Sequence, residues 1–259
     1  MSSITQKGCN GPLPLTANGT FQQATDVALA TLVGTRWDLS DGGEVILVST
    51  PSGTTTVAGL LYQDAALVAN HQDMAVTAFV AYGTSGGVAN STSTPATVTA
   101  TLGGTAITLN QYQGGFLIVE EGTGIGQTLR IQENAAQATT NGNVLITLED
   151  APNLALDTTS KVSLVPAHGS NIIVNPTTPT NVPVGVALYA ISPSSYGFLK
   201  VKGLVGAVSD SSNASVGNSV AASTTTAGNV TLFVATKTYV GSAAITGVST
   251  KATPIILNL

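Results

Sequence analysis

The residue types that carry hydrolytic chemistry are sparse in this sequence of 259 residues. It holds two histidines, His71 and His168, far apart in the chain, and Asp73 closely follows the first. A Ser-His-Asp set needs its three side chains within hydrogen-bonding reach of one another. Two histidines among many serines produce such neighbours by chance, and no G-x-S-x-G elbow marks a nucleophile. We therefore expect no catalytic residue, and hydrolysis by a Ser-His-Asp set stays open as the alternative.

Three acidic residues close together, Asp38, Asp41 and Glu44, offer oxygens of the kind that Ca²⁺ prefers. Their spacing is not that of an EF-hand loop. A surface turn that starts at Asp41-Gly42 explains the same residues. We expect no metal site, and calcium binding in this turn is the alternative.

Other acidic and aromatic residues give no stronger signal. The adjacent pairs Glu120-Glu121 and Glu149-Asp150 stand at the ends of expected strands. Neighbouring residues of a strand point to opposite faces, so neither pair is a ready acid–base couple. The only tryptophan, Trp37, fits a core or interface anchor better than a sugar platform.

A glycine-rich stretch, Gly122-Thr-Gly124-Ile-Gly126, follows an apolar run and faintly resembles a dinucleotide-binding fingerprint. Its spacing is G-x-G-x-G, whereas the fingerprint is G-x-G-x-x-G. Residues 127–131 alternate like a strand and do not open the helix whose N-terminus would hold a phosphate. The stretch predicts a glycine hairpin, and we expect no cofactor.

The composition points toward an assembly and away from nucleic acid. Charged residues make up 8% of the chain, against about 25% in an average globular domain. The net charge is −5, and the eight Lys and Arg residues form no cluster of the kind that nucleic-acid binding needs. A low-charge surface suits a face that is built into an assembly, because burying charge is unfavourable. The plainer alternative is an acidic β protein.

No segment predicts a membrane span, a disulfide framework or an export signal. The longest apolar runs are strand-sized, far below the roughly 18 residues that a spanning helix needs, so we expect no membrane partner. The single cysteine, Cys9, excludes an intramolecular disulfide and leaves an intermolecular bridge open. Residues 1–11 lack a basic segment followed by an apolar one, so we expect no general secretion.

Frequent Val, Ile and Thr, separated by turn signals, predict an all-β fold of sandwich or barrel type. Gly103-Gly104 is interpreted as a two-residue hairpin turn between residues 98–102 and 106–109. Short helical turns are expected only at 64–70 and 153–158. The expected strands are 44–49, 55–61, 75–81, 96–102, 105–109, 115–120, 128–133, 143–148, 160–165, 185–191, 198–205, 219–222, 230–236, 243–248 and 254–259.

We expect four segments along the chain. Residues 1–24 are polar and rich in Gly and Pro, which predicts an extended N-terminal arm. Residues 25–174 are expected to form the main β-sandwich or barrel domain. Residues 175–184 contain three prolines and predict a stiff linker. Residues 185–259 are expected to form a small β-barrel.

The second half carries a series of turn glycines in a recurring order. The sequences are PVGVA at 183–187, YGFLKVKG at 196–203, SVGNSV at 215–220, AGNV at 227–230 and VGSA at 240–243. This order resembles the small β-barrel modules of tailed-bacteriophage capsid decoration (cement) proteins, in which such glycines mark successive hairpins. In the first half, Gly34-Thr35, Asp41-Gly42-Gly43 and residues 122–126 are similar to phage virion proteins of the same kind.

The resemblance implies a non-enzymatic virion protein on the outer capsid surface, assembled in the cytoplasm of the host bacterium. It further implies a homotrimer that is fixed by its N-terminal arm to several subunits of the major capsid protein. The family has no catalytic, cofactor or metal residues to transfer. The alternatives are another structural protein, such as a tail, head-fibre or bacterial surface component, and a carbohydrate-active β enzyme.

Overall fold

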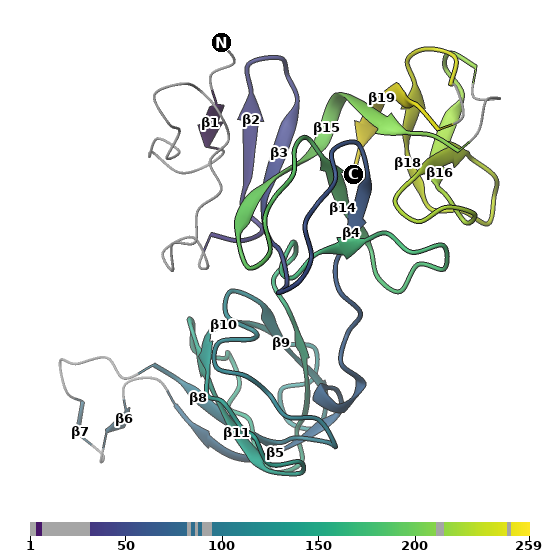
Figure 1. The fold of residues 1–259 in the computed structure, drawn as a ribbon. Coiled ribbons are helices and arrows are strands. Elements are labelled where there is room, and N and C mark those ends of the chain that lie inside the picture. The colour runs from purple at the N-terminus through teal and green to yellow at the C-terminus, as the bar shows by residue number, and fades with distance from the viewer. Residues whose placement is uncertain are drawn as a thin grey trace. The chain divides into compact units, whose positions relative to one another are not determined.

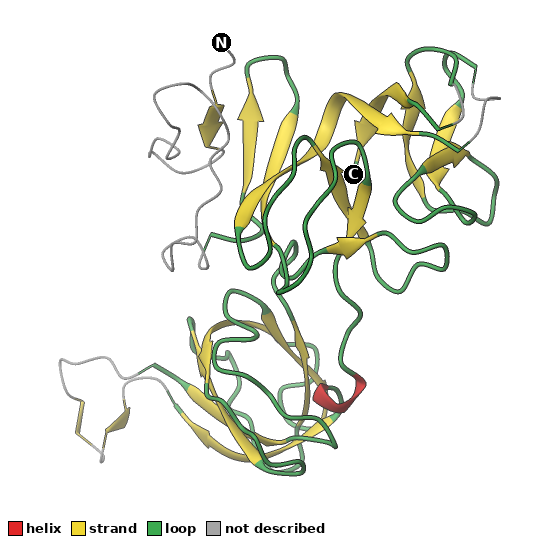
Figure 2. Cartoon of the chain, viewed as in Figure 1, coloured by secondary structure: helices red, strands yellow, loops and turns green. Residues whose placement is uncertain are grey.

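The computed structural model describes residues 32–81, 95–210, 215–247 and 250–259, together with the backbone of short strands at 4–6, 84–85 and 88–89. Strands make up 44% of the chain and helix 1%, which confirms the predicted all-β class (Figure 2). Among the described residues, the helical part is one short 3-10 turn, Ala69–His71. Within the described ranges, no helix has the length and apolar character needed to cross a membrane.

The chain forms two compact units, and one is inserted in the sequence of the other (Figure 1). Unit 1 comprises Met1–Ala66 and His168–Leu259, and unit 2 comprises Leu67–Ala167. The sequence interpretation had instead divided the chain at residues 175–184. The expected arm at 1–24 lies outside the described residues, apart from the backbone of 4–6.

The proline-rich segment lies inside unit 1 because strands on both sides of it share a partner. The short strand β4 (Leu61–Gln63) pairs with β13 (Ile173–Val174) and also with β14 (Pro183–Ala187). The three prolines therefore occupy a connection between two strands of one sheet. They do not separate two domains.

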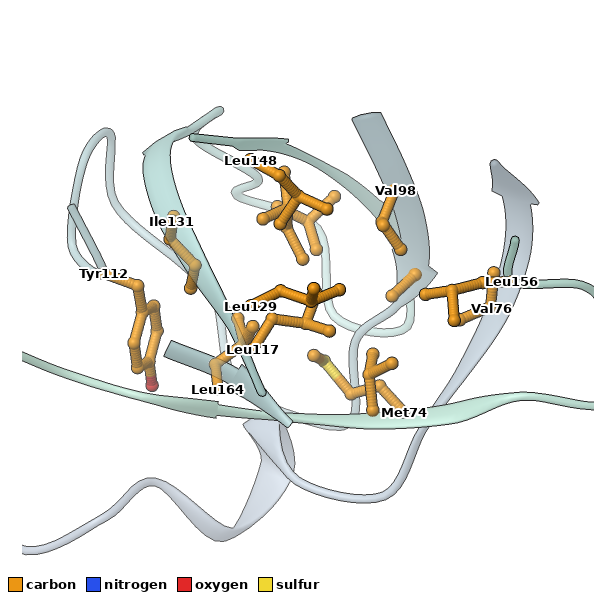
Figure 3. Close-up of a cluster of buried hydrophobic side chains, with 14 of the residues drawn as sticks. Met74, Val76, Val98, Tyr112, Leu117, Leu129, Ile131, Leu148, Leu156 and Leu164 are labelled. Atoms are coloured by element: carbon orange, nitrogen blue, oxygen red, sulfur yellow. The ribbon is translucent and has the colours of Figure 1, made fainter. Parts of the chain in front are cut away.

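Unit 2 contains a closed six-stranded barrel. Along its strands, buried apolar residues alternate with more exposed ones; in β10, for example, Leu129 and Ile131 are buried between exposed Thr128, Arg130 and Gln132. Figure 3 shows the resulting core, where side chains from different strands gather in the interior. In barrel order the strands are β10 (Thr128–Asn134), β11 (Asn143–Leu148), β8 (Thr97–Thr101), β5 (Met74–Val80), β12 (Lys161–Val165) and β9 (Phe116–Glu121).

Unit 1 is an eleven-stranded sheet that curls into a half-barrel. The long strand β15 pairs with β3 along its first part and with β19 along its second part (Figure 1). The main order is β1 (Ile4–Gln6), β2 (Arg36–Leu39), β3 (Glu44–Ser49), β15 (Tyr196–Val208), β19 (Ala252–Asn258), β18 (Tyr239–Ala243), β16 (Ser219–Ala222) and β17 (Val230–Leu232). A separate two-stranded piece, within the residues of unit 2, consists of β6 (Thr84–Ser85) and β7 (Val88–Ala89).

Trp37 anchors the core on the β2 side of this sheet. It is 1% exposed, and its ring meets Phe198 edge-to-face with centroids 5.3 Å apart. This confirms the core interpretation of the only tryptophan.

The predicted Gly103-Gly104 hairpin is wrong. Strand β8 ends at Thr101 and pairs with β5 and β11, and the following residues form only an isolated bridge between Ile107 and Gln137. Gly103 instead allows a close approach: its N–H donates to the Asn70 carbonyl, and a Cβ there would lie 2.9 Å from that of Asn70.

Several other expected elements differ from the structure. Residues 55–60 form no strand because Gly59 turns the chain with a φ of 82°, and β4 starts only at Leu61. Ala243 ends β18 where a strand was expected to begin, and part of the expected strand 243–248 lies outside the described residues. Residues 153–158 contain no helical turn.

Candidate interaction surface

His71 is a buried member of unit 2. Its Nε2 lies 3.1 Å from the Thr105 carbonyl, which only accepts, so Nε2 carries the proton in the neutral ring. Its Nδ1 then accepts from the Tyr112 hydroxyl at 2.7 Å. Burial raises the pKa of Tyr112 to about 12, which keeps this hydroxyl protonated. Asp73 forms an ion pair with Lys161 at 3.1 Å instead of orienting the histidine.

His168 has an acidic partner in unit 1 that the sequence did not suggest. Its Nδ1 lies 2.7 Å from Oδ2 of Asp64, and the other oxygen of Asp64 accepts the Gly169 N–H at 2.7 Å. Within the part of the chain that the structure describes, no serine or threonine hydroxyl forms a hydrogen bond with His168. The histidine and the carboxylate join the two segments at which the chain leaves and re-enters unit 1.

Two of the three acidic residues that were considered as calcium ligands form ion pairs with lysines of β15. The Lys200 Nζ donates to Oδ2 of Asp41 at 2.8 Å, and the Lys202 Nζ donates to Oε1 of Glu44 at 3.1 Å. The other Asp41 oxygen accepts the Gly43 N–H, as the predicted surface turn requires. The hydrogen bond from Lys200, reinforced by that of Gly43, lowers the pKa of Asp41. Asp38 lies in β2, opposite Glu44 in register.

The glycine-rich stretch is a hairpin, as predicted. It joins the antiparallel strands β9 and β10, and Gly122, Gly124 and Gly126 have φ values of 74°, 86° and 86°. Thr123 Oγ1 donates to the Asp157 carboxylate at 2.6 Å and fastens the turn to a neighbouring loop.

Members of the two acidic pairs form surface ion pairs. Glu121 lies 3.0 Å from the Lys161 ammonium, and Glu149 lies 3.0 Å from Nε of Arg130. All four side chains belong to unit 2 and are more than a third exposed. Their geometry is that of ordinary surface ion pairs.

The outer face of β15 and β19 carries an apolar stretch next to Lys202, which lies on the same face opposite Asn258 and is 51% exposed. Leu204 and Ile256 are directly opposite in register, and their exposed fractions are 60% and 54%. Residues that face each other in this way lie on the same side of a sheet. We call this surface the neutral face; it consists of Leu204, Gly206, Val208, Ala252, Pro254 and Ile256.

Gly206 leaves a hollow in the neutral face that the fold of the chain does not require. Its φ is not positive, and a Cβ there would have only ordinary contact, 3.7 Å from the Ala252 Cβ. At Gly241, by contrast, a Cβ would overlap the Ile256 carbonyl oxygen. A glycine inside a strand destabilises it by about 0.5–1 kcal/mol relative to alanine. A glycine inside a strand often marks a bulge, a bend, or a place where a ligand or another backbone approaches closely.

One sequence signal could have identified the neutral face. Ile255, Ile256 and Leu257 are consecutive in a strand, and consecutive side chains alternate between faces. Ile255 and Leu257 are fully buried, so Ile256 has to point outward. Sequence reasoning placed this strand but not its two faces.

No protein-family model, curated protein or solved structure matches the chain.

Proposed function

We propose that this chain is a non-enzymatic structural protein of a tailed-phage particle, which binds the outside of the capsid and stabilises the expanded shell. The observation that carries the proposal is the neutral face, in which two exposed apolar residues lie opposite each other beside a glycine. Contiguous exposed apolar surface is typical of a protein–protein contact.

The sequence resemblance supports the same assignment from another side. Its motifs at 183–187, 196–203 and 240–243 correspond to β14, the first part of β15 and β18. Leu204 directly follows the second of these motifs, within the same strand. The surface suited to burial therefore lies in the part of the chain that resembles the decoration proteins.

The partner in this proposal is the major capsid protein, contacted by three copies of the chain. A ligand that binds only the expanded lattice stabilises that state by mass action. Many copies that each bridge neighbouring subunits add their contributions through multivalency. The role requires a rigid surface and no chemistry, which agrees with carboxylates that are held by lysines and arginines.

The test is co-sedimentation of the purified protein with expanded shells that lack it. We expect saturable binding to expanded shells, weak binding to unexpanded ones, and a higher temperature of shell disruption. The double variant Leu204→Asp and Ile256→Asp should bind at least about 100-fold more weakly, because two carboxylates would be desolvated. Leu145→Asp is the matched control, since Leu145 is 46% exposed on the barrel of unit 2.

Failure to bind either form of the shell would overturn the proposal. Equal loss of binding in the control variant would show that the neutral face is not the contact. Location of the protein at the tail, in labelled particles, would assign it to the alternative class of virion component.

A further inference from the structure

The first strand of unit 1 is paired at the end of the sheet. Strand β1 pairs only with β2, antiparallel, and Thr5 lies opposite Asp38 in register. Strand β2 has β3 on its other side, so β1 completes its hydrogen bonding. Without β1, β2 would present an open edge, which is a template for any other strand.

The connection between β1 and β2 is unusually long for neighbouring antiparallel strands. It comprises residues 7–35, which is 29 residues, whereas β2 and β3 are joined by four and β9 and β10 by six. Hairpin connections ordinarily take about 2–5 residues. A chain of this length reaches about 100 Å when extended, well beyond the about 30 Å diameter of a small domain.

We propose that β1 of one copy pairs with β2 of a second copy when the copies are concentrated. The ladder formed in this exchange has the same register and the same backbone hydrogen bonds as the ladder within one chain. The choice between them therefore depends on the concentration of β1 near β2. A linker that reaches its site gives an effective concentration of up to about millimolar order, and a second copy at that concentration competes for the same edge.

The exchange makes each copy a donor of one strand and an acceptor of another. Such a head-to-tail contact closes into a ring when the rotation between copies permits it. The occupant of the β2 edge is thus residues 4–6 of a neighbouring copy. The inference rests on the pairing of β1 and on the connection length, and it does not depend on a role in a virus particle.

The test is a disulfide that only exchanged copies can form. Two variants of the chain are mixed, and both carry Cys9→Ser. The first also carries Thr5→Cys and an affinity tag, and the second also carries Asp38→Cys. Directly opposite residues of antiparallel strands have Cα atoms about 4.5–5.5 Å apart, which suits a disulfide. After mixing at about 1 mM and mild oxidation, we expect a tagged, disulfide-linked heterodimer.

The matched control replaces Asp38→Cys by Ser52→Cys, in an exposed turn away from β2. The heterodimer yield should be at least about tenfold higher with Asp38→Cys than with this control. Equal yields would overturn the exchange. A single chain with both Thr5→Cys and Asp38→Cys should form its internal disulfide in dilute solution. Failure to do so would show that β1 does not pair with β2, and the inference would fall with it. Shell binding does not enter this readout, so the result is separate from that of the proposed function.

Discussion

The two units differ in how they pair the edge strands of their sheets. Unit 2 closes six of its strands into a barrel, in which every strand has two partners. Unit 1 leaves its sheet open, with β17 at one end of the main order and the short β1 at the other. Closure removes the edges through which sheets associate, whereas an open sheet keeps them. The barrel of unit 2 therefore has no open strand edge, whereas the sheet of unit 1 keeps two.

The surfaces of the two units also carry different polar and apolar side chains. The outer wall of the barrel carries Thr97, Thr99 and Thr101 on β8, with the Arg130–Glu149 ion pair nearby on the surface. In unit 1 the Lys200 side chain is only 5% exposed, and the neutral face lies next to Lys202, which forms an ion pair with Glu44. The barrel wall also exposes apolar side chains, among them Val80, Phe116 and Leu145. The two units therefore differ in the pairing of exposed apolar residues across β15 and β19 and not in their polarity as a whole.

The largest expected effect tests whether the barrel is independent. Ile131→Ala removes a fully buried side chain from the unit 2 core and should lower the free energy of unfolding by about 2–5 kcal/mol. Hydrogen exchange should show the loss of protection in unit 2 only, because the core residues of the barrel all come from 74–164. Leu145→Ala, at an exposed position of β11, is the control. Equal loss of protection around Ile46 in unit 1 would show that the units unfold together.

The second prediction contrasts two glycines of the open sheet. Gly241→Ala should destabilise the protein by about 1–3 kcal/mol, because the new Cβ would overlap the Ile256 carbonyl. Gly206→Ala should instead stabilise it by about 0.5–1 kcal/mol. Urea unfolding of both variants measures the difference. Destabilisation by Gly206→Ala would mean that its hollow serves the fold and not a partner.

The third prediction concerns the acid stability of the open sheet. The pKa of Asp41 is lowered in the folded protein, so its contribution is present at neutral pH and is lost as the pH falls below the ordinary value of about 4. Asp41 is 50% exposed although Lys200 is 5% exposed, so water screens the pair and about 1 kcal/mol is expected.

The measurement is urea unfolding of the wild-type protein and of Asp41→Asn between pH 7 and pH 3. The variant should be less stable at pH 7, and the difference should shrink toward pH 3. A difference that stays constant across this range would assign the effect to the turn at Gly43 and not to the charge.

The smallest expected effect on stability is at the neutral face. Ile256→Thr should change the free energy of unfolding by no more than about 0.5 kcal/mol, because Ile256 is 54% exposed. The same change should raise the solubility of the isolated protein, as measured by precipitation with ammonium sulfate. Thr99→Val on the barrel wall provides the opposite control and should lower solubility.

Local patterns predicted individual strands but not their long-range partners. Residues 44–49, 143–148 and 219–222 were expected as strands, and they coincide with β3, β11 and β16 because each run is bounded by turn residues. The insertion of unit 2 depends on the pairing of β4 with β13 and β14, more than a hundred residues later in the chain. No local pattern contains that information.

The site predictions show the same limit. The hairpin at 122–126 followed from its glycines, whereas the two glycines at 103–104 serve the contact with Asn70. The partner of His168 was missed because Asp64 lies far away in the sequence. Composition indicates a surface that tolerates burial, but only register places Leu204 opposite Ile256.

The bond between Asp64 and His168 has a consequence for engineering. It holds together the two points of unit 1 at which residues 67–167 depart and return. The inserted sequence is therefore a replaceable segment whose two attachment points on the half-barrel are adjacent. A foreign domain whose own termini lie close together fits the same opening, as domain insertion at surface positions generally requires. Exchanging the segment would leave the strand order of the host sheet unchanged and turn the chain into a carrier for displayed proteins.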